Sequence, residues 1–522
     1  MISEVFSAGV VGVDGYEVTV ECSGFDRLPN FELVGLPDAA VKEAKERVRS
    51  ACENSGVRFP AMELTVNLAP ANIKKEGSAF DLAILVSVLA VSGALPRGCD
   101  LSADTFIGEL SLSGDLRPVR GVLPMVLAAR DAGRRTVFVP LENAEEASVV
   151  SGVTVLGIRS LAELLAHLAG TATVAPTVYD PEEFRAGVVS VTDDFAEVRG
   201  QRAAKRALEI AAAGGHNILL IGPPGSGKSM LAKRLPGILP DMTFEEALET
   251  TKVHSVVGAL AGRLMCTRPF RAPHHSVSQV GMIGGGANPR PGEISLAHNG
   301  VLFLDEMPEL PKHISEALRQ PLEDGRVTVT RAQARVTYPS RFMLVGAMNP
   351  CRCGYYGDPT HVCTCTPREV AKYLDRVSGP MLDRMDLQVE VPAVSFGEIS
   401  GTGGEGAGAP AETSSAIRAR VNAARAFAKE RLARHGDAFV TNAAMPVSIL
   451  RRECVLTDAA MEMLGAAYEE LGLSARGHDR ILRVARTIAD LDRSDKIDAD
   501  HIAENFKAYI QGFSDNIKDI LN

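Results

Sequence analysis

Eight consecutive residues have the types and the spacing that suit the binding of a phosphate group. They are Gly222, Pro223, Pro224, Gly225, Ser226, Gly227, Lys228 and Ser229, and they follow the pattern G-x-x-x-x-G-K-S. The glycines let backbone N–H groups close around phosphate oxygens, the lysine can reach the β- and γ-phosphates, and the serine hydroxyl suits Mg²⁺. The apolar run 218–221 predicts a strand before this loop, and the helix expected after it points its positive end at the same anion. The sequence therefore predicts an ATP or GTP site rather than a glycine-rich turn without a ligand.

Two carboxylates, Asp305 and Glu306, follow the short apolar run 301–304, which predicts a buried parallel strand. Asp305 could hold Mg²⁺, and Glu306 could polarise an attacking water. The alternative is a core strand with a solvated acidic end, and the phosphate loop upstream weakens it. A third predicted strand, 342–347, brings Asn349 to the same edge, because ligands of open α/β sheets bind at the carboxyl ends of strands. Asn349 could sense the γ-phosphate or orient the water.

A cluster of cysteines follows Asn349 directly. Two C-x-C pairs are separated by nine residues, and their members are Cys351, Cys353, Cys363 and Cys365. Thiolates this close suit a tetrahedral Zn²⁺, and the turn 354–359 could bring the pairs together. His361 is a possible substitute ligand. The alternative is four reduced thiols without a metal, since C-x-C is tighter than the usual C-x₂-C spacing. We expect a structural Zn²⁺ that braces the strand ending at Asn349.

Composition sets the broad class. A chain of 522 residues that is 46% hydrophobic predicts about three packed domains. No apolar run is long enough to span a bilayer and the first four residues are not basic, so we expect a cytoplasmic protein with no membrane partner. The nine cysteines should then be thiols or metal ligands rather than disulfides. A net charge of −10 argues against a general coating of nucleic acid, but it allows a local basic channel.

The predicted organisation is α/β with three domains. Residues 1–170 alternate short strand-like and helical patterns, which predicts an α+β domain, and 171–195 resemble a linker. Residues 196–395 carry all the nucleotide motifs and predict a P-loop α/β core, with the cysteine insertion at 351–365. A glycine-rich linker is expected at 396–413. Residues 414–522 show apolar spacing near 3.6 and predict a helical domain.

Two stretches, 252–290 and 326–341, contain basic residues and no acidic ones. The second reads as a hairpin with a polar tip near Arg331 and Arg335, and the first contains Arg271. Basic side chains at these places could track the phosphates of DNA without reading its sequence. The alternative, which carries similar weight, is a solvated basic face or a salt-bridge surface.

The motif blocks together resemble one family. These blocks are 222–229, the RPFRAPHH block at 268–275, GEISLAH at 292–298 and NPC at 349–351, and they look like those of magnesium-chelatase-like AAA+ ATPases. The match is strongest to the ComM/YifB branch, because the chain also carries a similar amino-terminal domain. The resemblance implies a homo-oligomeric ring, a hexamer, that uses ATP and Mg²⁺ to move on DNA. It also implies a helicase or branch-migration role in natural transformation or recombination.

The same resemblance assigns two arginines. The segment 378–386 is similar to the one that supplies the arginine finger in AAA+ rings, so Arg384 would reach the γ-phosphate of a neighbouring subunit. The segment 474–483 is similar to the lid helix that carries the second sensor of the nucleotide. Arg476 is the better candidate there, and Arg480 is the alternative. Without these motifs each arginine would read as a surface salt bridge.

The amino-terminal segments 74–81, 106–116 and 122–133 resemble the Lon protease domain. Lon-type proteases use a serine activated by a lysine. The alignment places Ala79 at the nucleophile position and Leu123 at the lysine position, so we expect a catalytically inactive scaffold. A shifted dyad of Ser78 with Lys74 or Lys75 has no geometry in its favour.

The function expected from the sequence is an ATPase motor acting on DNA. Lys228 and Mg²⁺ would neutralise charge, Glu306 would orient the water, and Asn349 and Arg476 would sense the phosphate. A chelatase-like ATPase that remodels a protein partner shares the same motor core, but such subunits generally lack the amino-terminal domain. A nucleotide-gated scaffold is the third alternative, and the complete set of hydrolysis residues argues against it.

Overall fold

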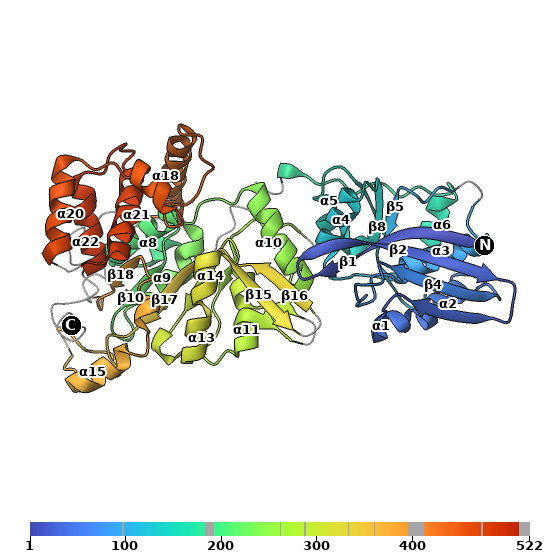
Figure 1. Cartoon of the computed structure of the whole chain (residues 1–522), viewed down its shortest axis with the longest axis horizontal. Coiled ribbons are helices and arrows are strands. Elements are labelled where there is room, and N and C mark those ends of the chain that lie inside the picture. The colour runs from blue at the N-terminus through green and yellow to red at the C-terminus, as the bar shows by residue number, and fades with distance from the viewer. Residues whose placement is uncertain are drawn as a thin grey trace. The chain divides into compact units, whose positions relative to one another are not determined.

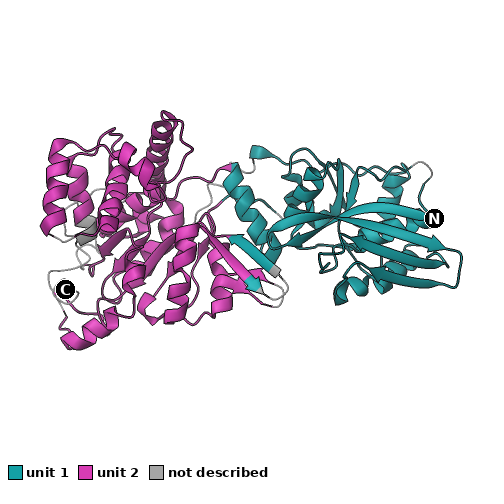
Figure 2. Ribbon diagram, in the orientation of Figure 1, with its two compact units in different colours: residues 1–186, 244–266, 330–338 teal, residues 187–243, 267–329, 339–522 magenta. Residues whose placement is uncertain are grey.

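The computed structural model describes residues 1–96, 99–182, 193–260, 263–286, 289–331, 334–359, 361–394, 412–470 and 473–510. These residues form two compact units, and Figure 2 shows each in its own colour. Unit 1 comprises 1–186, 244–266 and 330–338, and unit 2 comprises 187–243, 267–329 and 339–522. The glycine-rich run 401–410 and residues 183–192 of the expected first linker lie outside the described residues.

Unit 1 is built on a seven-stranded mixed sheet with the order β3-β4-β2-β1-β5-β8-β9. The strands are β1 (Ile2–Val11), β2 (Asp14–Phe25), β3 (Asn30–Val34), β4 (Glu63–Ala69), β5 (Asp104–Phe106), β8 (Thr136–Pro140) and β9 (Thr154–Ile158). A two-stranded sheet of β6 (Glu109–Leu110) and β7 (Leu116–Arg117) accompanies it. β1 pairs with β2 in antiparallel fashion, whereas β5, β8 and β9 run parallel to one another.

Helices pack on both faces of this sheet: α3 (Asp81–Ser92) contributes to one core cluster and α4 (Val122–Asp131) to the other. Side chains of each strand alternate between the two clusters, as the geometry of a strand requires. On β8, Phe138 belongs to one core cluster, and Val137 and Val139 belong to the other. The described helices are α1 (Ala39–Lys42), α2 (Ala44–Asn54), α3 (Asp81–Ser92), α4 (Val122–Asp131), η1 (Leu141–Asn143), α5 (Ala144–Ser148) and α6 (Leu161–Leu168). Helix α3 is apolar on all sides and is buried along almost its whole length.

Unit 1 also contains a helix from the middle of the chain, α10 (Phe244–Val257), which packs on α4. Leu248 of α10 packs on the apolar cluster to which α4 contributes. Buried polar contacts add to this: Ser255 donates to the carboxylate of Glu146 on α5, and the Ser255 carbonyl accepts from the N–H of Gly121 at 3.1 Å. Lys252 adds an ion pair of 3.1 Å to Asp14. A segment that lies among the nucleotide motifs in sequence is therefore anchored by the fold of the first 186 residues.

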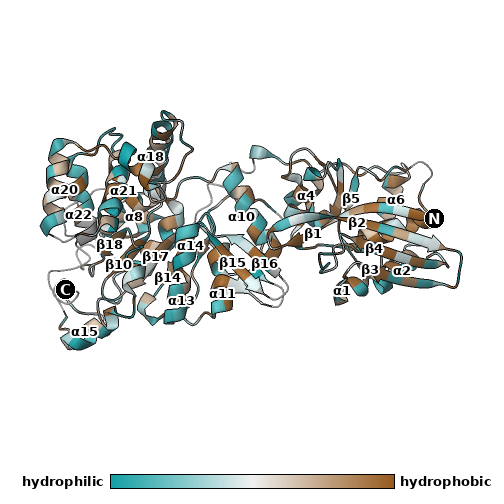
Figure 3. Cartoon of the chain, viewed as in Figure 1, coloured by the Kyte–Doolittle hydropathy of each residue, from teal (hydrophilic) through white to brown (hydrophobic). Residues whose placement is uncertain are grey.

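Unit 2 contains a five-stranded parallel sheet with the order β11-β14-β17-β10-β18. The strands are β10 (Ile218–Ile221), β11 (Phe270–Arg271), β14 (Val301–Leu304), β17 (Met343–Met348) and β18 (Leu387–Glu390). β10, β14 and β17 are buried along their whole length, which explains their uninterrupted apolar sequences. The strands expected at 218–221 and 301–304 are confirmed, and the third lies one residue later than expected. Figure 3 shows hydrophobic residues along these strands.

Helices surround this sheet. They are η2 (Phe195–Glu197), α8 (Arg202–Gly214), α9 (Lys228–Arg234), η3 (Leu235–Gly237), α11 (Gln279–Ile283), α12 (Glu293–Leu296), η4 (Met307–Glu309), α13 (Lys312–Ala317), α14 (Arg319–Asp324), α15 (Pro367–Leu374) and α16 (Gly379–Leu382). A short sheet pairs β12 (Gly284–Gly285) with β13 (Arg290–Pro291). The hairpin expected near 326–341 is confirmed as β15 (Arg326–Arg331) and β16 (Ala334–Pro339).

The described residues of the carboxy-terminal part, 412–470 and 473–510, are mainly helical, as expected, and Figure 1 shows them in orange and red. Its described helices are α18 (Ser414–Ala433), α19 (Val447–Glu453), α20 (Asp458–Glu470), α21 (Ala475–Leu491) and α22 (Ala499–Ile510). α18 and α21 pack on α8 and share its core cluster, whereas α19 to α22 build a smaller core of their own. Across the described residues, the structure contains no helix of the length and apolar character needed to cross a membrane.

Candidate nucleotide and metal site

The phosphate loop lies between β10 and α9, as the sequence predicts. Gly225 and Gly227 adopt φ angles of 78° and 92°, which only glycine takes without strain. The Lys228 ammonium donates to the carbonyls of Gly222 at 2.7 Å and Pro223 at 2.9 Å, and to Asn349 Oδ1 at 3.2 Å. Desolvation by this burial lowers the pKa of Lys228 to about 8, while the nearby charge of Asp305 acts in the opposite direction. The structure thus brings the loop lysine and the predicted sensor together.

The two side chains expected to hold Mg²⁺ are in direct contact. Ser229 donates a hydrogen bond of 2.7 Å to Asp305 Oδ2, and Asp305 Oδ1 accepts from the N–H of Glu306 at 2.9 Å. A hydroxyl and a carboxylate are ligands that suit Mg²⁺, and an ion between them would replace their hydrogen bond. Asp305 is exposed, so a metal with its own waters has access to it.

Glu306 extends from the same strand end into solvent, with 59% of its side chain exposed. Its backbone is left-handed, with φ at 49°, which is uncommon for a residue that is not glycine. The carboxylate lies 3.4 Å from Nδ1 of His275, whose ring lies 4.0 Å from that of His274 between centroids. From sequence alone no role is evident for His275, although it belongs to the RPFRAPHH block. That block lies far from Glu306 in sequence, so only the fold reveals the pair.

The side-chain hydrogen bonds of Arg384 are to residues outside the group formed by Lys228, Ser229, Asp305 and Asn349. The Arg384 guanidinium donates to the carboxylate of Glu323 and to the carbonyl of Pro380, and 13% of its side chain is exposed. The backbone around it is braced, because Asn217 donates to the Arg384 carbonyl at 3.0 Å. A role for Arg384 in trans, across a subunit interface, is compatible with this position and stays a prediction.

The two arginines considered for the second sensor, Arg476 and Arg480, differ in their surroundings. Arg476 lies in the first turn of α21 and is exposed. Arg480, one turn later, is buried and donates to the carbonyls of Asp383 at 3.3 Å and Met385 at 3.1 Å. Arg480 therefore supports the backbone on both sides of Arg384, which favours Arg476 as the residue available to a phosphate.

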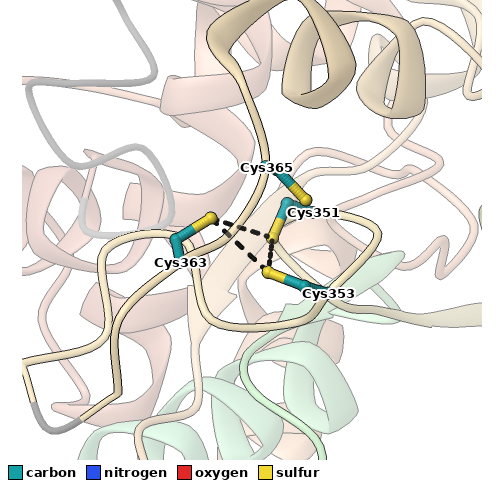
Figure 4. Close-up of side chains that lie close together, drawn as sticks. All are labelled: Cys351, Cys353, Cys363 and Cys365. Carbon is teal, nitrogen blue, oxygen red and sulfur yellow. Dashed lines mark hydrogen bonds between the residues drawn. The ribbon is translucent and has the colours of Figure 1, made fainter.

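The cysteines gather around one point (Figure 4). The Sγ atom of Cys351 lies 3.3 Å from that of Cys353 and 3.8 Å from that of Cys363, and the last two are 3.5 Å apart. With Cys365 included, all four sulfurs lie within 4.8 Å of one another. Zinc–sulfur bonds of about 2.3 Å in a tetrahedron place sulfurs about 3.8 Å apart, so the arrangement fits a single metal ion. His361 is outside this set: its Nδ1 atom lies 3.6 Å from a carboxylate oxygen of Asp358.

The backbone around the cluster suits thiolates. Burial alone would raise the pKa of Cys353, but the N–H groups of Tyr355 and Thr364 and the neighbouring thiols lower it to about 5. The N–H groups of Gly354 and Tyr356 point at Cys351 in the same way, although burial keeps the pKa of Cys351 raised. Four sulfurs with N–H donors aimed at them could hold a soft divalent metal such as Zn²⁺.

Arg271, expected as a DNA contact, is engaged within the chain. Its guanidinium forms a two-pronged ion pair with Glu293, at 2.6 and 2.7 Å. Other cations of the stretch 252–290 also have acceptors, including Lys252, which pairs with Asp14, and Arg263, which lies 3.2 Å from Glu145. Most of this stretch therefore fits the salt-bridge alternative better than a phosphate track.

The hairpin of β15 and β16 presents a basic side chain to solvent. Arg335 is exposed on β16, and it alternates with the buried residues Val336 and Tyr338. The buried face of β16 packs closely against Gly12, because a Cβ atom added to Gly12 would lie 2.3 Å from Cγ1 of Val336. Arg331 ends β15, and its side chain lies outside the described part of the structure. The exposed face of the hairpin remains available as a basic surface.

The amino-terminal unit has no serine–lysine pair at the positions that the Lon resemblance indicates. Ala79 and Leu123 occupy those positions, and both are buried in one apolar cluster. Ser78 donates to the carboxylate of Glu109, and Lys75 donates to backbone carbonyls, with desolvation lowering the pKa of its ammonium. Lys74 pairs with Glu76 at 2.9 Å. Neither lysine bonds to Ser78, so the shifted dyad gains no support.

Comparison with known proteins agrees with these motifs. Three family models match: "Magnesium chelatase, subunit ChlI" at residues 194–399, "Subunit ChlI of Mg-chelatase" at 18–143, and "Magnesium chelatase, subunit ChlI C-terminal" at 411–508. The competence protein ComM of Haemophilus influenzae is 44% identical over 502 residues, covering 96% of each chain. YifB of Escherichia coli is 43% identical over 504 residues, again covering 96% of each chain.

A more distant relative is the magnesium-chelatase 38 kDa subunit of Rhodobacter capsulatus. It is 27% identical over 174 residues, which cover 30% of this chain and 50% of that subunit. The full-length matches and the three family models place the motifs described above in one context. The chain belongs to the ComM/YifB family of magnesium-chelatase-like AAA+ ATPases.

Proposed function

We propose that the protein hydrolyses ATP with Mg²⁺ and uses the energy, as a hexameric ring, to move on DNA. The observation that supports hydrolysis is the meeting of Lys228, Ser229, Asp305 and Asn349 at one edge of the unit 2 sheet. Similarity to a protein named for competence supports DNA as the partner. The expected process is helicase or branch-migration activity in transformation or recombination, in the cytoplasm.

Each of these residues has its own role in the proposed hydrolysis of ATP. Lys228 neutralises charge on the β- and γ-phosphates, and Mg²⁺ bound by Ser229 and Asp305 supplies further positive charge there. Glu306 orients the attacking water, and Asn349 senses the γ-phosphate through its position beside Lys228. Arg384 of one subunit and Arg476 of the lid complete the charge stabilisation.

A structural Zn²⁺ in the four-cysteine cluster belongs to the same proposal. The distances between the sulfurs and the N–H groups that point at them support it. The Lon-like amino-terminal unit is proposed as an inactive scaffold, because Ala79 and Leu123 carry no group that could act as nucleophile or base.

The deciding experiment measures the ATPase rate alone, with single-stranded DNA and with branched DNA. Stimulation by DNA, together with displacement of a branch, supports the motor. An ATPase that ignores DNA would favour the second candidate, a chelatase-like ATPase that remodels a protein partner. The similarity to the Rhodobacter capsulatus chelatase subunit is the observation in favour of that candidate.

A further inference from the structure

The cysteine cluster and the phosphate loop touch each other. Gly354 follows Cys353 directly and has φ at 90°. A Cβ atom built on Gly354 would lie 2.5 Å from Cδ and 2.7 Å from Cγ of Pro224. Since Pro224 is part of the phosphate loop, the backbone of the cysteine turn lies directly against the ring of a loop residue.

A second connection reaches the loop from the other end of the turn. Cys351 lies two residues after Asn349, whose Oδ1 atom accepts from Lys228 at 3.2 Å. The preceding carbonyl, that of Met348, accepts from the N–H of Gly222 at 3.2 Å. The cysteine turn therefore contacts the phosphate loop at Pro224. The residues just before it, Met348 and Asn349, contact the loop at Gly222 and Lys228.

The cysteine segment has little regular structure of its own. Between the end of β17 and the start of α15 the described residues form turns and bends, and only Cys351 of the four cysteines is buried. Cross-linking such a segment through its sulfurs restricts its conformations, because a metal closes a loop that otherwise samples many states. A metal ion at the cluster would thus fix the surface on which Pro224 rests.

We propose that metal bound by Cys351, Cys353, Cys363 and Cys365 preorganises the phosphate loop, so that the metal and the nucleotide bind with positive coupling. The inference rests on the proposed metal site and goes beyond its structural role. With the turn fixed, less conformational entropy is lost when the loop closes on phosphate. Linkage requires the reverse effect of equal size, so a bound nucleotide must tighten the hold on the metal.

The first test uses the whole chain and reads the metal rather than the activity. Zinc content is measured, and zinc affinity is then determined by equilibrium competition with a chromogenic chelator, with and without a non-hydrolysable ATP analogue. Coupling energies of the usual size predict a zinc affinity that is higher by about fivefold or more with the analogue. Lys228→Ala, whose affinity for the analogue should be much lower, serves as the negative control and should show little change in zinc affinity when the analogue is added.

The second test perturbs the contact and leaves every thiol in place. Gly354→Ala should keep the metal but weaken nucleotide binding, because its Cβ would strike Pro224. Gly436→Ala is the matched control: Gly436 also has a positive φ, of 75°, but has nothing within 4 Å of the added Cβ. The control should bind nucleotide normally.

The outcomes separate the possible failures. Zinc near zero per chain overturns the metal site and the coupling with it. One zinc per chain, with equal zinc affinities in both conditions and a normal nucleotide affinity for Gly354→Ala, overturns the coupling alone. A higher zinc affinity with the analogue supports the coupling even if the protein proves unable to move DNA, since the readout needs only binding.

Discussion

Ser229 donates a hydrogen bond of 2.7 Å to Asp305, although the two residues are 76 positions apart in the sequence. The phosphate loop follows β10 and the carboxylate follows β14, and β17 lies between these strands. The two strand ends must therefore reach across a third strand to meet, directly beside Asn349. The geometry that the hydrolysis proposal requires is built by the strand order.

Lys228→Ala should reduce ATP affinity by at least about tenfold, because a hydrogen bond to a charged group contributes about 1.5–3 kcal/mol. Binding of a fluorescent ATP analogue measures the effect. Lys233→Ala is the control, since Lys233 lies on the same helix and is exposed. Equal affinities for the two variants would show that Lys228 does not hold phosphate.

Glu306→Gln should bind ATP normally and hydrolyse it about 10²- to 10⁴-fold more slowly, because the water loses its oriented base while Asp305 still holds Mg²⁺. Binding and single-turnover hydrolysis are measured side by side. Glu309→Gln, three residues along, removes an exposed carboxylate that pairs with Arg376 and should change little. Full turnover by Glu306→Gln would show that Glu306 does not orient the attacking water.

Arg384→Ala should bind ATP and hydrolyse it at least about 10³-fold more slowly, as loss of an arginine finger does elsewhere. Its guanidinium pairs with Glu323 of the same chain, so the finger must leave that carboxylate to act across an interface. Mixing Arg384→Ala with Lys228→Ala subunits tests this, because one interface type in the mixture has both an intact site and an intact finger.

Partial recovery of the ATPase in the mixture is the expected result. Each homogeneous variant, assayed at the same total concentration, is the control. If labelled subunits demonstrably exchange and the rate still stays at the background of the single variants, Arg384 does not act in trans.

The strands that surround the candidate nucleotide site could be predicted from the sequence for a physical reason. Each motif directly follows a short apolar run, and the carboxyl ends of neighbouring parallel strands share one edge. Local pattern and topology therefore agree, and the runs before Gly222 and Asp305 became β10 and β14 as expected. The cysteine spacing likewise required only a turn between the two pairs.

Other features depend on contacts between distant segments. The acid-free stretch around Arg271 suggested a phosphate track, but its partner, Glu293, lies just beyond the stretch. Ser255 and Glu146 meet although they are 109 positions apart in the sequence, and neither residue type signals the contact. No periodicity or composition reveals such pairs, because they arise only when the chain has folded.

The buried Glu146 predicts a pH dependence in unit 1. Burial raises its pKa, although donation from Ser255, from the N–H of Leu123 and from Asn143 acts in the opposite direction. An acid with a raised pKa in the folded state binds protons more tightly there, so its contribution to stability falls as pH rises from the unfolded pKa, about 4.3, through the raised value. The variant Glu146→Gln has no carboxyl group at this position, so it lacks this dependence of stability on pH.

The stability of Glu146→Gln relative to the unaltered protein should therefore increase with pH over that window and then level off. Hydrogen exchange of the amides in α4 and α10 measures local stability at several pH values. Glu145→Gln is the matched control, because the neighbouring Glu145 is 60% exposed and pairs with Arg263. A difference that is independent of pH, or that increases as pH falls, would contradict the assignment.

The hairpin of β15 and β16 is the proposed contact with DNA. Arg335 is exposed on β16, Arg331 ends β15, and the stretch between 326 and 341 contains no acid. Arg331→Ala combined with Arg335→Ala should weaken DNA binding for all sequences alike, because phosphates carry no sequence information. Fewer counterions are then released, and the slope of log affinity against log salt should become shallower by about 1.4 on single strands if two contacts are lost.

The matched variant replaces both arginines with lysine, which keeps the charge and should keep most of the salt slope. Arg326→Ala, at the base of the same hairpin, tests whether any exposed arginine there has the effect. Basal ATPase should survive in all three variants, since none of these residues is assigned to the nucleotide, whereas stimulation by DNA should fall only in the double alanine variant. If the double alanine variant assembles correctly and keeps its DNA affinity and salt slope, the hairpin has a structural role, in which Val336 packs against Gly12. DNA would then be held elsewhere.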